Sequence, residues 1–233
     1  MRITMPKVDQ KHVVEKKRLI VDAAIRVCKS KPAYAVTLRD VVKECGISQG
    51  GLYHYFKDID EIFAEILNRS FSENRIDKHN FKIFESNKPP REIIIDSFAI
   101  WGQLMDDITN QYGSLIYELN AIYLREPKRM KKMLDRLRVN DDAKTFHDKI
   151  FSFIETHVAN GNFELMVPKE DLRLIVDVTM AGIQQSVTFS RKLYDKESSL
   201  EGINEYTTAK AMMIILAHAI NGLLCSSGPK FKI

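Results

Sequence analysis

Cysteine is scarce in this sequence, and its histidines form no recognisable metal-binding or catalytic motif. The three cysteines, Cys28, Cys45 and Cys225, lie far apart in a chain of 233 residues. This spacing argues against a disulfide framework and against a Cys-x-x-Cys metal site. The six histidines are also scattered, and no His-x-x-x-His pair, nucleophile elbow or phosphate loop is visible. The sequence therefore predicts no metal, no cofactor and no enzymatic activity.

Long apolar runs are also missing. The longest strongly apolar stretch, Ala209 to Cys225, contains Lys210, His218 and Asn221 and is short for a membrane span. The N-terminus lacks the charged start and apolar core of a signal peptide. We therefore expect a cytoplasmic protein with no membrane role.

The charge that is present is unevenly distributed. Hydrophobic residues make up 45% of the sequence and charged residues 28%, which is ordinary for a globular protein with a small and a larger domain. Of the 35 Lys and Arg and 31 Asp and Glu, residues 1–60 hold 12 and 7, so the basic excess lies at this end. Such an excess favours a polyanionic partner, although a solvated surface is the plainer alternative.

The stretch TLRDVVKECGISQGGLYHYFK, residues 37–57, has the pattern of two short helices joined by a tight turn. Thr37 followed by Asp40 resembles a capping box, which predicts a helix from Leu38 to Cys45. Gly46 tolerates the left-handed conformation that ends such a helix, and Ser48 can cap the next one. This is the pattern of a helix-turn-helix.

The second of these helices offers an open face to a partner. At about 100° per residue, Leu52 and Phe56 point inward, while Gly50 and His54 point outward. Two glycines in a first turn cost roughly 1 kcal/mol each in helix propensity, which makes sense if the backbone must approach something closely. A DNA major groove admits a helix whose first residues meet base edges. The predicted DNA contacts are Thr37, Ser48, Gln49, Gly50, Gly51, Tyr53, His54, Tyr55 and Lys57.

The run from Arg18 to Phe63 resembles the N-terminal domain of the TetR family of bacterial transcription regulators. The matching positions are Ile20, Ala23, Ala24, Thr37, Gly46-Ile47-Ser48 and Leu52-Tyr53-x-x-Phe56. The sequence departs from the family at Pro32, Val36 and Ile59, the last standing where a lysine commonly contacts phosphate; Lys57 is the nearest substitute. The resemblance implies a regulator that dimerises through its last long helices.

The rest of the chain is helical in period, with no convincing strand pattern. We expect breaks at Thr109–Gln111 and Glu126–Pro127 and a helix from Asp142 to Ala159. The predicted fold is all-α. Residues 1–70 form a three-helix helix-turn-helix domain that binds DNA, and residues 71–233 form a larger helical domain for ligand binding and dimerisation.

The last two predicted helices, Leu172–Leu193 and Glu205–Cys225, are apolar nearly all round. Two buried faces are implied, and the second most simply packs on another copy of the chain as a four-helix bundle. Val178, Leu216 and Ile220 are the predicted dimer contacts.

Aromatic, thioether and polar side chains in the middle helices suit an apolar small-molecule pocket. Helical stripes of this kind are usually ordinary core, and the family resemblance favours the pocket. The predicted lining is Trp101, Met105, Tyr117, Tyr123, Phe151, Met180 and Gln184.

Three functions remain open at this point. The first is a repressor that binds an inverted-repeat operator in double-stranded DNA as a homodimer and is released by a small apolar or aromatic effector. The second is an architectural or cell-division DNA-binding protein of the same fold with no ligand. The third is an enzyme with a DNA-binding appendage, which would need a catalytic constellation that the sequence lacks. Cys45 lies beside the second helix of the helix-turn-helix, the one predicted to read DNA. It has two alternative interpretations, a redox sensor or simply a small residue that fits the turn.

Overall fold

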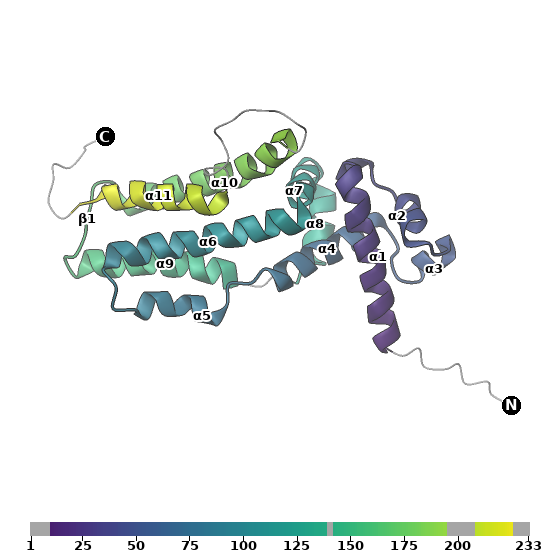
Figure 1. The fold of residues 1–233 in the computed structure, drawn as a ribbon, viewed down its shortest axis with the longest axis horizontal. Coiled ribbons are helices and arrows are strands. Elements are labelled where there is room, and N and C mark those ends of the chain that lie inside the picture. The colour runs from purple at the N-terminus through teal and green to yellow at the C-terminus, as the bar shows by residue number, and fades with distance from the viewer. Residues whose placement is uncertain (1–9, 139–141, 195–207, 226–233) are drawn as a thin grey trace. The chain divides into compact units, whose positions relative to one another are not determined.

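The computed structural model describes residues 10–138, 142–194 and 208–225, whose regular secondary structure is helical apart from one short strand pair (Figure 1). The chain forms two compact units. Unit 1 comprises residues 1–72 and 115–139, and unit 2 comprises residues 73–114 and 140–233. The functional division between residues 70 and 71 stays a prediction, and these units add residues 115–139 to the N-terminal part.

Unit 1 contains the helix-turn-helix and two later helices. Its elements are α1 (Gln10–Ser30), the 3-10 turn η1 (Ala33–Ala35), α2 (Leu38–Cys45), α3 (Gln49–Tyr53), α4 (Ile59–Glu73, of which Glu73 falls in unit 2), α7 (Leu115–Arg125) and α8 (Pro127–Leu134). Ile20, Ala23 and Ala24 of α1 are buried, as is Phe63 of α4. These side chains therefore belong to the core of unit 1.

Unit 2 is a helical bundle built along α6. Its elements are α5 (Lys78–Phe81), the 3-10 turn η2 (Lys82–Glu85), α6 (Pro90–Tyr112), α9 (Asp142–Ala159), β1 (Glu164–Leu165), α10 (Lys169–Tyr194), α11 (Ala209–Leu223) and β2 (Leu224–Cys225). In Figure 1, α6 runs beside α9 and α11. Residues 205–207, the predicted start of the last helix, lie outside the described residues.

The close packing of α6 against α11 depends on a glycine and a buried carboxylate. A Cβ at Gly102 would lie 2.4 Å from the Cα of Lys210, so only glycine allows this approach. One turn later, the Asp106 carboxylate accepts hydrogen bonds from the backbone N–H groups of Ala209 (2.8 Å) and Lys210 (3.0 Å). Asp106 thereby satisfies donors that the first turn of α11 leaves free.

The expected break at Thr109–Gln111 is wrong, and one short strand pair accompanies the helices. Thr109–Gln111 is helical, and the backbone ladder continues until the Gly113 N–H donates to the Thr109 carbonyl at 2.9 Å. The helix ends at Gly113, whose φ is +59°, and the Thr109 hydroxyl is taken up by the Met105 carbonyl within the helix. The short strands β1 and β2 pair antiparallel, Glu164 opposite Cys225 and Leu165 opposite Leu224. Strands of two residues are too short to show the period-2 alternation that predicts a strand.

Among the described helices, none is long and apolar enough to cross a membrane.

Candidate nucleic-acid interface

The helix-turn-helix opens with a reciprocal cap at the start of α2. The Thr37 hydroxyl accepts a hydrogen bond from the Asp40 N–H at 3.3 Å, and the Asp40 carboxylate accepts one from the Thr37 N–H at 2.8 Å. The Lys31 ammonium lies 2.7 Å from the same carboxylate. Hydrogen bonds from Lys31 and Thr37 lower the pKa of Asp40 to about 2. The cap predicted from the sequence is therefore present and charged.

The turn between α2 and α3 uses one left-handed residue and a second cap. Gly46 follows the last residue of α2 with φ of 69°, which a residue with a Cβ adopts at a cost. Ser48 then accepts a hydrogen bond from the Gly51 N–H at 3.1 Å and caps α3. Both features were predicted from the sequence.

The reading helix α3 is short and has a distinct inner and outer side. Leu52 is 0% exposed and Phe56, just after the helix, is 2% exposed, so both anchor the motif. Gly51 and Tyr55 are half-buried and line a cavity of about 330 Å³ that residues of α1 also border. The predicted DNA contacts that lie exposed are Thr37, Ser48, Gln49, Gly50, Tyr53, His54 and Lys57.

The two glycines of α3 differ in what surrounds them. A Cβ at Gly51 would lie 3.1 Å from the Ser48 hydroxyl oxygen, so the cap itself favours glycine there. A Cβ at Gly50 would meet nothing within 4 Å. Among the described residues, no packing contact therefore requires glycine at position 50.

The thiol beside this helix is poorly suited to redox sensing. Cys45 is free, and burial raises its pKa above the ordinary thiol value. Because the thiolate is the reactive form, a raised pKa favours the view that Cys45 is only a small residue that fits the turn.

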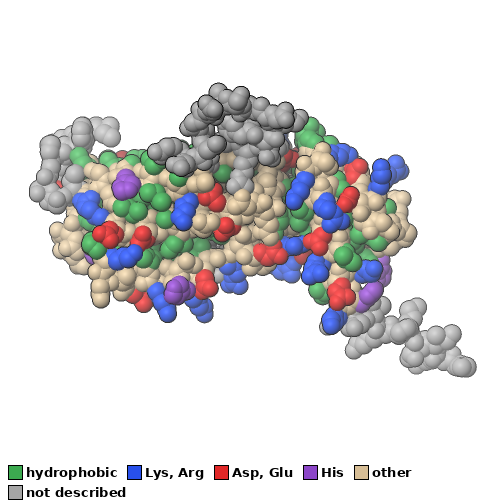
Figure 2. Space-filling view, in the orientation of Figure 1, with side chains coloured by type: hydrophobic (Ala, Val, Ile, Leu, Met, Phe, Trp, Pro, Cys, Tyr) green, Lys and Arg blue, Asp and Glu red, His purple; other side chains and the backbone are tan. Residues whose placement is uncertain are grey.

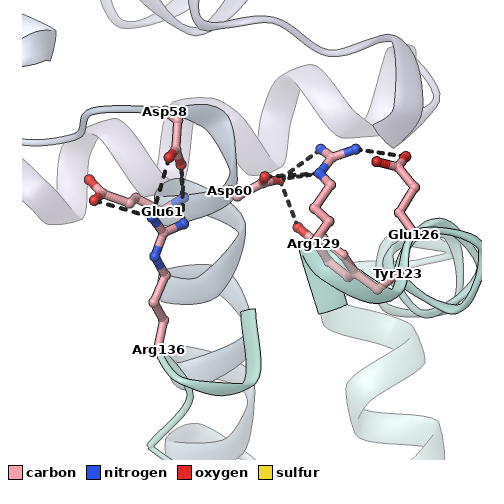
Figure 3. A network of polar contacts seen from close by, with 7 residues as sticks. All are labelled: Asp58, Asp60, Glu61, Tyr123, Glu126, Arg129 and Arg136. Atoms are coloured by element: carbon pink, nitrogen blue, oxygen red, sulfur yellow. Dashed lines mark hydrogen bonds and ion pairs between the residues drawn. The ribbon is translucent and has the colours of Figure 1, made fainter. Parts of the chain in front are cut away.

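Helices α7 and α8, together with the residues up to Arg138, are named here the α7–α8 arm, and this arm grips the start of α4 (Figure 3). Asp60, in the first turn of α4, accepts hydrogen bonds from the Tyr123 hydroxyl (3.0 Å) and the Arg129 guanidinium (2.7 Å). Arg136 pairs with Asp58 at 3.2 Å and with Glu61 at 3.6 Å. No local sequence pattern signals this network, because its partners lie about 70 residues apart.

Electrostatics and burial reinforce these contacts. Hydrogen bonds to Asp60 raise the pKa of Arg129, so its charge is permanent. Burial, and then the charge of Asp60, raise the pKa of Tyr123, which keeps its hydroxyl a donor. Partial burial alone would raise the pKa of Asp58. Hydrogen bonds from Arg136 and from the Glu61 N–H have the larger combined effect, so the pKa lies below the ordinary value of an aspartate.

The same arm contacts the rest of unit 1 at two further points. Asn68 of α4 donates to the Arg136 carbonyl at 3.1 Å and accepts from the Arg138 N–H at 2.6 Å. The Glu118 carboxylate of α7 accepts a hydrogen bond from the Ala33 N–H of η1 at 2.8 Å. The arm therefore brackets the helix-turn-helix from the α1–α2 connection to α4.

The difference in net charge between the two units is larger than the difference between residues 1–60 and the rest of the sequence. Unit 1 holds 20 of the 35 Lys and Arg residues and 12 of the 31 Asp and Glu residues, a formal balance of +8, which leaves −4 for unit 2. Figure 2 shows basic and acidic side chains interspersed over the visible face. The excess in unit 1 is thus a net surplus within a mixed surface.

The side chains predicted to line a ligand pocket do not all come together. Phe151 is buried in the hydrophobic core of unit 2, and Trp101, Met105 and Met180 pack against that core. Gln184 lies half-buried on α10. Tyr117 and Tyr123 belong to unit 1 instead, and Tyr123 is committed to Asp60.

The predicted dimer residues also divide. Val178 on α10 is 63% exposed, whereas Leu216 is 6% exposed and Ile220 0%. Leu216 and Ile220 are buried in the core of their own chain, so their assignment to a dimer contact needs correction. Large apolar side chains that are exposed on the same two helices are Leu174, Ile175, Val178 and Ile215.

An all-helical fold with a capped helix-turn-helix at its N-terminus defines the class of this chain as a helix-turn-helix protein. Residues 20–66 match the family described as "Bacterial regulatory proteins, tetR family". The helix-turn-helix segment of this chain is thus similar to the N-terminal domain of that family. The prediction of a TetR-like, all-α protein is confirmed.

The curated relatives match mainly in the N-terminal part. The HTH-type transcriptional regulator YfiR of Bacillus subtilis (strain 168) is 37% identical over 75 residues, which cover 31% of this chain and 37% of YfiR. The HTH-type transcriptional repressor Rv1474c of Mycobacterium tuberculosis is 37% identical over 60 residues, 25% of this chain and 32% of that protein. The chain spans between 32% and 50% of the length of the curated relatives it matches. Both names are those of transcription regulators and neither is that of an enzyme, in agreement with the prediction of no enzymatic activity.

Similar solved structures cover nearly the whole chain at low identity. The ketosteroid transcriptional regulator KstR2 of Mycobacterium tuberculosis has a TM-score of 0.54 and 18% identity, and the match covers 90% of this chain and 94% of KstR2. PfmR, a TetR family regulator from Thermus thermophilus, has a TM-score of 0.54 and 14% identity, with 86% of this chain and 96% of PfmR covered. At such identities the likeness is one of fold.

Proposed function

We propose that this protein is a transcription regulator that binds double-stranded DNA through α3. The observation that carries the proposal is Gly50, an exposed glycine in the first turn of α3 that no contact among the described residues requires. A partner that comes close to the backbone explains it, and a base pair in a major groove is such a partner. The basic balance of unit 1 supports the same partner, since phosphates dominate the affinity of DNA-binding proteins.

The exposed residues around α3 have separate roles in this proposal. Gln49, at the start of the helix, reads a base edge. Thr37, Tyr53 and Lys57 hold phosphates, which position the helix and carry no sequence information. Ser48 contributes mainly as the cap, although its hydroxyl hydrogen remains available to a phosphate oxygen.

A variant at Gly50 tests the proposal. The operator is first selected from a random pool of duplexes with the wild-type protein. Gly50→Leu should then abolish binding, because its side chain would stand between helix and groove, while the circular dichroism spectrum and melting temperature stay near those of wild type. Gln49→Ala should bind with a preference relaxed at one base pair, worth roughly 1 to 3 kcal/mol. Wild-type affinity in both variants would sink the assignment of α3.

We further propose that the protein is a homodimer on an inverted repeat and that a small apolar effector weakens its hold on DNA. The exposed apolar side chains of α10 and α11 support a dimer, because a two-fold pair of such faces removes them from water. The aromatic and thioether groups around Trp101 and Phe151 support an apolar effector in unit 2. The alternative function is that of an architectural DNA-binding protein that binds no small molecule.

Reciprocal linkage separates these alternatives. Trp101 is the only tryptophan, so its emission reports on the core where we place the effector. Effector affinity, measured by this emission, should fall by about 5-fold to 150-fold when operator is added, because coupling between two sites acts equally in both directions. Equal affinities with and without operator would favour the architectural alternative.

A further inference from the structure

The α7–α8 arm brings positive charge into the unit that holds the reading helix. Residues 115–138 contain seven Lys and Arg against three Asp and Glu. Arg129 and Arg136 form ion pairs with Asp60 and Asp58 at the start of α4. The lysines of α8 (Lys128, Lys131 and Lys132) are exposed, and none has an ion-pair partner among the described residues.

The three lysines point in two directions. Arg129 and the buried Met133 mark the side of α8 that faces the rest of unit 1, and Arg136, just after the helix, reaches the same way. At about 100° per residue, Lys128 and Lys132 lie one turn apart on one flank of that side, and Lys131 lies opposite to it. Lys128 and Lys132 accordingly line a cavity of about 660 Å³ together with Asp58 and Asp60.

This cavity is held at a fixed place relative to the reading helix. Asp58 follows the last residue of α3 by five positions, and it is paired with Arg136 at 3.2 Å. Asp60 is paired with Arg129 at 2.7 Å, and Figure 3 shows both arginines reaching the first turn of α4 from α8 and the turn after it. The cavity is also lined by Glu126, which shares Arg129 with Asp60, so its four basic and three acidic side chains leave a net charge of +1. Lys128 and Lys132 are the lining cations that have no ion pair among the described residues.

We propose that Lys128 and Lys132 contact the phosphate backbone of DNA that flanks the half-site read by α3. The inference rests on the proposed DNA-binding function and extends its interface to a second segment of the chain. A lysine ammonium on a flexible stem suits a phosphate as a point charge, with no demand on base sequence. The arm therefore lengthens the DNA footprint and leaves base preference unchanged.

The dependence of operator affinity on salt tests this. Each phosphate that a protein neutralises contributes about 0.9 to the slope of log affinity against log salt. The double variant Lys128→Gln with Lys132→Gln should bind a long operator duplex with a slope shallower by about 1 to 2, and with the base preference of wild type. The matched control, Lys131→Gln, changes the same kind of charge on the opposite side of the same helix and should keep the wild-type slope.

A shortened duplex gives an independent measurement. When the duplex is cut back to the half-sites, the slope of wild type should fall to that of the double variant, and the double variant should not change. Equal slopes for wild type and double variant on the long duplex would overturn the proposal while leaving α3 as the reading helix. An equal effect of Lys131→Gln would also overturn it, because it would reveal only the net charge of the protein. If wild type binds no duplex at any salt concentration, both this proposal and the proposed function fall.

Discussion

At the scale of single residues, the cap at Thr37 and Asp40 is the feature that sequence reasoning recovers best. Its two hydrogen bonds join residues three apart, so the pattern that predicts them is contained in four letters of sequence. The additional contact from Lys31, nine residues earlier, has no such pattern, and it is this ammonium that most strongly holds Asp40 in its charged form.

Asp40→Asn should make stability less dependent on pH. The folded pKa of about 2 lies below the value of about 3.9 expected for an unfolded aspartate, so the charge stabilises the fold above pH 4 and this stabilisation is lost as the pH falls towards 2. We expect the variant to melt below wild type at neutral pH, and the difference to shrink between about pH 4 and pH 2. Loss of the hydroxyl half of the cap in Thr37→Ala should cost about 1 kcal/mol.

Thermal melts across this pH range check the prediction. Asp135→Asn, an exposed aspartate with no ion pair among the described residues, is the matched control and should follow the wild-type profile. A melting difference that stays constant from neutral pH to pH 2 would mean that Asp40 is not charged through its contacts with Lys31 and Thr37.

At the scale of elements, helices with strong local signals were predictable and their packing was not. The bounds of α2 and α9 agree with the sequence, because caps, prolines and apolar period mark helix ends locally. The place of α7 and α8 beside the helix-turn-helix was not foreseen. Tyr123 illustrates the reason. An aromatic residue in an apolar stripe predicts a pocket or a core position, and only the hydrogen bond to Asp60 shows that Tyr123 joins α7 to α4.

The ion pair between Arg129 and Asp60 should contribute measurably to the stability of unit 1. Side-chain exposures of 29% and 20% indicate partial screening by water, so we expect a coupling energy of about 0.5 to 1.5 kcal/mol. A double-mutant cycle with Arg129→Gln and Asp60→Asn in urea unfolding measures it. Operator affinity should fall in the single variants, because the start of α4 follows the reading helix directly.

A second pair on the same arm serves as the control for this cycle. Arg138 and Glu65 also join the arm to α4, but their side chains are 70% and 35% exposed. Their coupling energy should lie below about 0.5 kcal/mol, as for most surface pairs. Equal coupling in the two cycles would show that Arg129 and Asp60 have no special part in holding α4.

At the scale of the whole molecule, burial redraws the predicted dimer face. The sequence showed that α10 and α11 are apolar all round, but it could not tell the side facing the chain's own core from the side facing a partner. The buried positions of Leu216 and Ile220 and the exposed position of Val178 make that distinction.

Glutamate substitutions at these positions should therefore give two different outcomes. Val178→Glu and Leu174→Glu place a carboxylate on an exposed face, so we expect folded monomers at micromolar concentration. Leu216→Glu buries an unpaired carboxylate in the core of the chain and should abolish folding. Light scattering reports the mass and circular dichroism the helix content; a dimeric Val178→Glu protein would place the interface elsewhere.

The chain leaves unit 1 after residue 72, returns at residue 115 and leaves again after residue 139. During synthesis, Asp60 therefore emerges long before Arg129, its partner 69 positions later. At about 5 to 20 residues per second, roughly 3 to 14 s pass in which the nascent helix-turn-helix has its caps but no arm. A gene fragment that stops near residue 70 would freeze the protein at that stage, with the carboxylates of Asp58 and Asp60 lacking their arginines. Grafting this DNA-reading head onto another protein thus requires two separate pieces of the gene.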